Sequence, residues 1–494
     1  MPELNYFSNK SIKDSLASKT ISGGISSVAT QAILLILHFV NLAVLSRMLS
    51  PEAFGLIAMV TAFTNFAIIF SNMGLSTATV QASSINHKDV SALFWLNVLV
   101  GLIIMTTFNL LSHSIVLFYA EPKLKQIILL LSFGFLFSAL GMQHEALLRR
   151  HLFLFRINIV YIIANILSMV VSIVIAYKGF GYWSLVWMTL SLAFFKMFGM
   201  WILCRWIPDL NFNFRSVFHL FKFGLNIAGF NIVNYLSRNL DKVLIGKFVS
   251  TAALGEFSRA DQMALFPLRK VNGPLSASVQ PALSRLQNDP EKYKEFYCNS
   301  LKCISFIGTP LVFFLFLMAD EITLLVLGPQ WTEASLILKC LMPAALCGVT
   351  NVATGWVYNS LGHVNRQFKW GVYTSIFLCI SIIIGINWGV IGVALAISIS
   401  RVIQKVPSLL YCYYGTFLEL SDFAKVFIPS LNISALSFVI TSILKFSYFD
   451  SCMFGLNIFI SFLVFSVLYT LAILKFYKSD YLLIFKYLSN MRSG

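Results

Sequence analysis

Charged residues are scarce in this sequence. Asp, Glu, Lys and Arg make up 11% of its 494 residues, whereas a soluble globular domain carries about 25%. Hydrophobic residues make up 58%, and the mean hydropathy is +0.80. Soluble domains could not bury this much apolar surface. The sequence therefore predicts an all-α polytopic membrane protein, whose helices satisfy their own backbone hydrogen bonds inside the bilayer.

Several motifs of catalysis and cofactor binding are missing. The sequence contains no GxxxxGK(S/T) loop, no HExxH, no GxSxG elbow and no Cys-His zinc spacing. The eight cysteines are scattered and never form CxxC, which argues against a disulfide framework or a structural metal site. We therefore predict that the protein is not an enzyme, uses no cofactor or metal and hydrolyses no ATP. The sequence leaves open whether H⁺ or Na⁺ serves as a coupling ion.

The N-terminus is not typical of a cleavable signal peptide. Residues 1–20 are polar, and the first apolar stretch is too long for a signal core. We expect the first membrane span itself to direct insertion.

Basic residues are in excess, with 36 Lys and Arg against 20 Asp and Glu. Windows of about 20 residues, the length that crosses a bilayer, divide the chain into about fourteen spans. With a cytoplasmic N-terminus, 20 Lys and Arg fall on the inner side and six on the outer side. This asymmetry predicts a multi-pass protein of the bacterial inner membrane with both termini in the cytoplasm. Because topology accounts for the basic excess, we expect no nucleic-acid partner.

The sequence contains an internal duplication. LSRMLSPEAFG (45–55) aligns without a gap with IGKFVSTAALG (245–255), 200 residues later. If about eleven residues are inserted in the second half, GFGYWSLV (179–186) also resembles WGVIGVAL (388–395), and each is followed within about four turns by intramembrane cations, Lys196 in one and Arg401 with Lys405 in the other.

The duplication predicts two parallel six-helix lobes with two extra C-terminal helices. The predicted division is an N-lobe over 1–204, a cytoplasmic linker over 205–221, a C-lobe over 222–411, and spans 13 and 14 with the tail over 412–494. Such lobes favour an alternating-access carrier with its substrate site between them. The alternative is that the duplicated bundles only scaffold a complex.

Ten Lys and Arg residues fall inside predicted spans. A charge near the bilayer centre costs from about 2.5 to more than 10 kcal/mol, so such residues usually face a cavity or a pathway. Cations in excess of acids predict an anionic, phosphorylated substrate. The predicted substrate-binding residues are Arg238, Lys242, Arg259, Lys270, Asn234, Arg401 and Lys405. The predicted gating and counter-ion residues are Asp241, Asp261, Arg47 and Lys247, and Arg149 and Arg150 are predicted to receive the headgroup at the cytoplasmic mouth.

Each of these roles has a structural alternative. Arg238 and Asp241, three residues apart, could form an ion pair that pins their helix. Arg401 and Lys405 could extend to the membrane interface. Arg149 and Arg150 could serve only as topology determinants, and Arg47 and Lys247 could only shape their loops.

The chain resembles a known family through LSRMLSPEAFGLIAMV, NLDKVLIGKFVSTAALGEFSRA and PALSRLQND. It is similar to Wzx-type polysaccharide exporters, most of all to the colanic-acid exporter group. They belong to the multidrug/oligosaccharidyl-lipid/polysaccharide exporter superfamily, which also contains the lipid II flippase. The resemblance implies translocation of undecaprenyl-diphosphate-linked oligosaccharide units for O-antigen, capsule or colanic-acid-like polysaccharide, beside a polysaccharide polymerase and assembly proteins. The alternatives are a membrane polysaccharide polymerase or ligase, and a multidrug antiporter.

Overall fold

The computed structural model describes residues 16–71, 75–82, 85–210, 239–449 and 454–477. The described residues form helices and no strand, which confirms the predicted all-helical class. Two compact units divide the chain, Met1–Gly255 and Glu256–Gly494. Most of the predicted linker, 205–221, lies outside the described residues, so the predicted domain boundaries stay a prediction.

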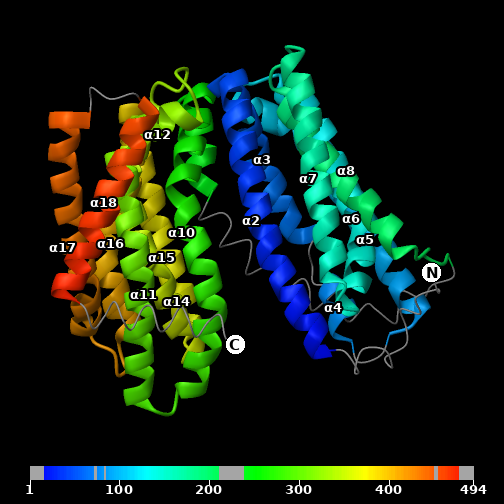
Figure 1. Cartoon of the computed structure of the whole chain (residues 1–494). Coiled ribbons are helices and arrows are strands. Elements are labelled where there is room, and N and C mark those ends of the chain that lie inside the picture. Colours follow the sequence, from blue (N-terminus) through cyan, green and yellow to red (C-terminus); the bar gives the residue numbers. More distant parts are fainter. Residues whose placement is uncertain (1–15, 72–74, 83–84, 211–238, 450–453, 478–494) are drawn as a thin grey trace. The chain divides into compact units, whose positions relative to one another are not determined.

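The first unit is built from antiparallel helical hairpins (Figure 1). Its helices are α2 (Leu16–Met48), α3 (Pro51–Ser71), α4 (Leu75–Gln81), α5 (His87–Tyr119), α6 (Leu124–Arg150), α7 (Leu154–Tyr177) and α8 (Trp183–Cys204), and residues 239–248 are also helical. Helix α6 packs against both α5 and α8, α7 packs against α8, and α2 packs along α7. The short helix α4 packs on α6.

The second unit repeats this hairpin organisation. Its helices are α10 (Thr251–Leu286), which begins in the first unit, α11 (Pro290–Leu317), α12 (Ala319–Val326), α13 (Ala334–Val349), α14 (Asn351–Ser360), α15 (Val364–Gly385), η1 (Ile386–Trp388), α16 (Gly389–Tyr413), α17 (Leu420–Leu444), η2 (Lys445–Phe449) and α18 (Phe454–Phe476). Helix α16 packs against α13 and α15, and α11 packs against α17.

The outer faces of these helices suit lipid rather than water. Large apolar side chains are exposed along them, such as Leu110 at 81%, Ile163 at 51% and Ile383 at 58%. Ten segments of the described chain are long and apolar enough to cross a membrane, and one of them, Val364–Tyr413, contains both α15 and α16. The protein is therefore a multi-pass membrane protein. The count of fourteen spans stays a prediction, because the predicted seventh span, 222–248, lies largely outside the described residues.

Helix α17 begins at a capping box. Glu419 accepts a hydrogen bond from the backbone N–H of Asp422, and Asp422 Oδ2 accepts one from the backbone N–H of Glu419 at 2.9 Å. Asp422, only 7% exposed, also forms a 2.8 Å salt bridge with Lys294 of α11. The cap thus fixes both the start of α17 and its attachment to α11.

Replacing Asp422 with Ala should remove one of the two hydrogen bonds of the capping box together with the salt bridge. We expect a loss of about 1–2 kcal/mol of stability, the usual effect of losing a side-chain cap. Thermal unfolding of the purified protein in detergent measures it. Ser421→Ala is the control, because Ser421 is exposed and, within the described part of the chain, its side chain bonds only the Glu419 carboxylate. An unchanged melting temperature in Asp422→Ala would contradict the structural role of this cap.

The two repeated segments lie against each other within the first unit. A Cβ atom placed on Gly55 would lie 1.8 Å from the carbonyl oxygen of Thr251, and one placed on Gly255 would lie 2.0 Å from that of Pro51. The contact is reciprocal, because Pro51 and Thr251, like Gly55 and Gly255, are 200 residues apart. Only glycine allows the backbones to approach this closely at both positions.

Candidate functional site

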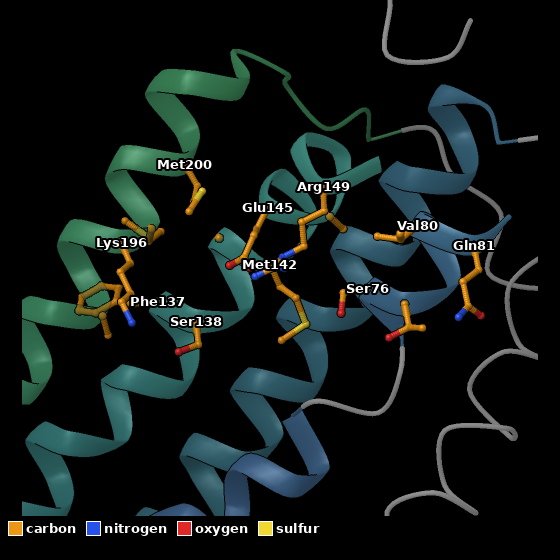
Figure 2. Close-up of a pocket in the computed structure, with 15 residues that line it drawn as sticks. Ser76, Val80, Gln81, Phe137, Ser138, Met142, Glu145, Arg149, Lys196 and Met200 are labelled. Atoms are coloured by element: carbon orange, nitrogen blue, oxygen red, sulfur yellow. Dashed lines mark hydrogen bonds and ion pairs between the residues drawn. The ribbon is translucent and has the colours of Figure 1, made fainter. Parts of the chain in front are cut away.

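A cavity of about 550 Å³ lies in the first unit among α4, α6 and α8 (Figure 2). Its polar and charged lining comes from Ser76, Thr77 and Gln81 on α4, Ser138, Glu145 and Arg149 on α6, and Lys196 on α8. Its apolar lining includes Val80, Phe137, Met142, Met197 and Met200. A wall in which polar groups alternate with apolar side chains can bind an organic ligand that carries a polar head.

One acidic side chain in the cavity is bound by its neighbours through a single carboxylate oxygen. Glu145 Oε1 accepts a 2.6 Å hydrogen bond from Arg149 Nε, one turn along α6, and a 2.7 Å bond from the hydroxyl of Tyr161 on α7. Arg149 also donates to that hydroxyl at 3.3 Å. The three side chains form a closed network in which the carboxylate neutralises the guanidinium.

Lys196 supplies a second cation with no acid of its own. Its ammonium lies 5.0 Å from the centre of the Tyr161 ring, a cation-π contact. Among the described residues it donates no hydrogen bond and forms no salt bridge. In Figure 2 Lys196 projects from α8, and Glu145 and Arg149 project from α6. With one acid and two cations, the cavity carries a formal charge of about +1.

Arg150, next to Arg149, binds backbone carbonyl groups instead of an acidic side chain. Its Nη1 donates to the carbonyl oxygens of Thr79 at 3.0 Å and Ala82 at 2.5 Å, at the C-terminal end of α4. The hydroxyl of Thr79 donates to Gln143 Oε1 of α6 at 2.8 Å. Arg150 therefore holds a wall of the cavity in place by binding carbonyls that a helix end leaves unpaired. Its predicted part in receiving a headgroup stays a prediction.

Replacing Arg150 with Gln should release the end of α4. We expect amide hydrogen exchange in residues 75–82 to speed up by about tenfold or more, since one to two kcal/mol of local stability is lost. The matched control is Arg149→Gln, one residue away, whose partners lie on α6 and α7. Equal exchange of α4 in both variants would contradict this assignment.

Lys405, the lysine of the second unit that aligns with Lys196, donates hydrogen bonds to other residues of the protein. Lys405 Nζ, on α16, donates to Thr350 Oγ1 at 2.7 Å, to Asn351 Oδ1 at 3.1 Å and to the carbonyl oxygen of Cys347 at 3.3 Å. It also lies 5.2 Å from the ring centre of Phe423. Lys405 thus ties α16 to the junction of α13 and α14, in contrast to Lys196. Arg401 lies one turn before it and is partly buried.

The other predicted site residues are only partly described. Arg238 and Asn234 lie outside the described residues, and the side chain of Lys270 is among those not described. Arg259 donates to Gln262 on its own helix at 2.6 Å, and Asp261, also on α10, is partly buried.

The predicted gating residues near the repeated segments have local contacts. Asp241 accepts the backbone N–H of Lys242 at 2.8 Å. Lys247 lies 5.3 Å from the ring centre of Phe118, and Arg47 is exposed at the end of α2. Their predicted roles in binding and gating stay predictions.

The structure brings together residues that the sequence did not group. Lys196 lies within a predicted span and Glu145 near the end of another, but nothing in the sequence relates the two to each other. Tyr161 carries no signal, since it resembles any aromatic residue in an apolar helix. The one available clue was Lys196, which aligns with Lys405 when the two hairpin segments are superposed.

Comparisons with known proteins agree with this architecture. The family described as polysaccharide biosynthesis protein matches residues 44–336. The lipopolysaccharide biosynthesis protein WzxC of Escherichia coli K12 is 26% identical over 402 residues, which cover 80% of this chain and 81% of that protein. Among solved structures, the lipid II flippase MurJ in an inward closed conformation has a TM-score of 0.74 at 17% identity, covering 93% of this chain and 99% of that one.

An inward-facing multidrug resistance MATE family transporter of the MOP superfamily shares the fold more distantly. Its TM-score is 0.59 at 14% identity, covering 79% of this chain and 95% of that one. At these identities the two solved structures establish the fold, whereas the match to the family model covers more than half of the chain. The family match, which covers more than half of the chain, identifies it: the chain belongs to the polysaccharide biosynthesis protein family.

Proposed function

We propose that this protein is a flippase that moves undecaprenyl-diphosphate-linked oligosaccharide repeat units across the bacterial inner membrane. The sugars and the diphosphate would pass through the protein while the polyprenyl tail stays in lipid. Two six-helix lobes would open alternately to either side, driven by an ion gradient or by the substrate gradient and without ATP hydrolysis. The product would feed a polysaccharide polymerase and its assembly proteins.

The observation that carries this proposal is the similarity to WzxC over 80% of the chain. That relative is named for lipopolysaccharide biosynthesis, and the MurJ structure is named for lipid II flipping. The surplus of positive charge in the cavity of the first unit adds support, since a diphosphate is an anion that Lys and Arg bind well. A carrier of cationic drugs would favour surplus carboxylates instead.

The proposed diphosphate contacts include those predicted from the sequence. Arg238, Lys242 and Arg259 are the foremost candidates, with Lys270, Asn234, Arg401 and Lys405 as further contacts. Asp241 and Asp261 would act as counter-ions that exchange partners during the cycle. The coupling ion, H⁺ or Na⁺, is part of the same hypothesis.

Depletion of the protein in cells that make a surface polysaccharide tests the proposal. Loss of a flippase should trap single lipid-linked repeat units on the cytoplasmic leaflet, whereas loss of a polymerase or ligase leaves them on the outer leaflet. Arg238→Ala and Lys242→Ala should each fail to restore the polysaccharide while accumulating in the membrane. Repeat units found outside after depletion would contradict the proposal, and drug efflux without polysaccharide loss would favour the antiporter.

A further inference from the structure

We propose that the cavity of the first unit is a phosphate-binding site in which Lys196 contacts the diphosphate of the lipid-linked substrate directly. This inference rests on the proposed function and names a binding site for it within a single unit. The ligand class is a prenyl diphosphate, whose phosphate oxygens would take the hydrogen bonds that the Lys196 ammonium does not make among the described residues.

The charges in the cavity favour an anion. Glu145 Oε1 accepts hydrogen bonds from Arg149 and from Tyr161, so the one acid among the described residues that line the cavity already neutralises one of its two cations. The ammonium of Lys196 is therefore the cation left over. A carboxylate or phosphate in the cavity would contact this ammonium, with the Arg149 guanidinium on the facing helix as a second cation.

The position of Lys196 makes the surplus positive charge energetically unfavourable when no ligand is bound. Lys196 lies eight residues before the end of α8 at Cys204, or about 12 Å along a helix that rises about 1.5 Å per residue. That depth falls inside a hydrocarbon core about 30 Å thick, where a cation needs a partner or water. The Tyr161 ring supplies one weak partner and fixes the side chain beside the cavity.

Comparison with Lys405 shows that the arrangement is not required by the fold. The two lysines align in the repeats, yet Lys405 is held by three oxygen atoms from the α13–α14 junction. Lys196 instead faces a cavity of about 550 Å³. In the second unit Lys405 therefore joins helices, whereas in the first unit Lys196 is available to a ligand.

The rest of the lining suits a phosphate that carries an apolar tail or a sugar. Ser76, Ser138 and Gln81 offer hydroxyl and amide groups, and Met142, Met197 and Met200 offer a flexible apolar surface. The volume is within the range of about 300–1,000 Å³ that organic ligands occupy. It accommodates a diphosphate with its first sugar or the first prenyl unit.

Binding to the purified full-length protein in detergent provides the test. The probe is farnesyl diphosphate, compared with farnesol, inorganic diphosphate and phosphatidylglycerol, and the readouts are a dissociation constant and the apparent melting temperature. Lys196→Met should weaken binding of farnesyl diphosphate by about 10- to 100-fold, the usual range for a lost charge-assisted hydrogen bond. Lys196→Arg should stay within a few fold of the original protein. Lys178→Met, an exposed lysine at the end of α7, is the control with the same charge change.

The ligand-free protein gives a second readout that a structural role would not reproduce. Lys196→Met removes an uncompensated cation and keeps an apolar side chain of similar length, so its melting temperature without ligand should be equal or higher. A lower melting temperature together with unchanged binding would assign Lys196 to folding and overturn the inference.

The outcomes separate this inference from the proposed function. If the original protein and Lys196→Met bind the diphosphate equally and both restore polysaccharide export, only the site assignment is wrong. If the original protein does not bind the diphosphate and its depletion leaves repeat units on the outer leaflet, the proposed function is wrong. Equal Lys196-dependent binding of phosphatidylglycerol would assign the phosphate to bilayer lipid and overturn the assignment to substrate.

Discussion

Replacing Gly55 with Ala is expected to destabilise the protein strongly, although it adds only one methyl group. The new Cβ would lie 1.8 Å from the carbonyl oxygen of Thr251, far inside van der Waals contact, and the obstructing atom is backbone. The segments that begin α3 and α10 would have to separate. Overpacking of this kind costs about 1–3 kcal/mol or more, so we expect a fall of a few °C in the apparent melting temperature and less protein in the membrane.

Two further glycine variants make this result specific. Gly255→Ala should give a similar loss, since its Cβ would lie 2.0 Å from the carbonyl oxygen of Pro51. Gly134→Ala, inside α6, is the control, because nothing lies within 4 Å of its added Cβ. There the change should be neutral or stabilise by about 0.5–1 kcal/mol through helix propensity. Equal melting temperatures for Gly55→Ala and Gly134→Ala would show that the repeated segments do not pack this closely.

Neutralising Glu321 is expected to produce the second large loss. Glu321 of α12 and Lys445 of η2 form a 2.5 Å salt bridge whose side chains are only 14% and 16% exposed. Glu321→Gln leaves the Lys445 ammonium buried without its paired carboxylate, with only neutral acceptors among the described residues, such as the Leu317 carbonyl oxygen at 3.4 Å and the new amide oxygen. Removing one partner of a buried pair costs about 3–5 kcal/mol, which thermal unfolding in detergent should register as an early transition.

The neighbouring acid supplies the matched control. Asp320 pairs with Lys339 at 2.6 Å, but its side chain is 63% exposed. Asp320→Asn should cost about 1 kcal/mol or less because solvent screens that pair. The double variant Glu321→Gln with Lys445→Met should recover much of the stability lost in Glu321→Gln alone. A double variant that is no more stable than the single one would mean that the buried charge is not the cause.

Much of the fold could be predicted from the sequence, because apolar runs of bilayer length are typical of membrane-spanning helices. The helices α5 to α8 and α15 to α18 all follow from this signal. Helix α10 does not follow from it, because its hydropathy is too low for a membrane span and its sequence contains three prolines. It nevertheless forms one continuous helix of 36 residues. Polar side chains that bond along the helix, such as Arg259 to Gln262, offset part of that polarity.

The candidate site was harder to predict, because it depends on which helices pack together. The positions of charges within and at the ends of predicted spans identified Arg149 and Lys405 but could not reveal whether the protein itself compensates them. Only packing shows that Lys405 is held by its neighbours while Lys196 faces a cavity. Tyr161 joins three helices through a ring and a hydroxyl, and no periodicity in the sequence distinguishes it from a lipid-facing residue.

Transport by the purified protein tests the proposed function most directly. Proteoliposomes would contain a fluorescent undecaprenyl-diphosphate-linked oligosaccharide, and a membrane-impermeant quencher would report which leaflet holds it. We expect the protein to expose the inner-leaflet pool without added ATP, and we expect Lys196→Met to slow this exposure while Lys178→Met does not. Exposure no faster than in protein-free liposomes, under an imposed H⁺ gradient, an imposed Na⁺ gradient or neither, would contradict the assignment as a flippase.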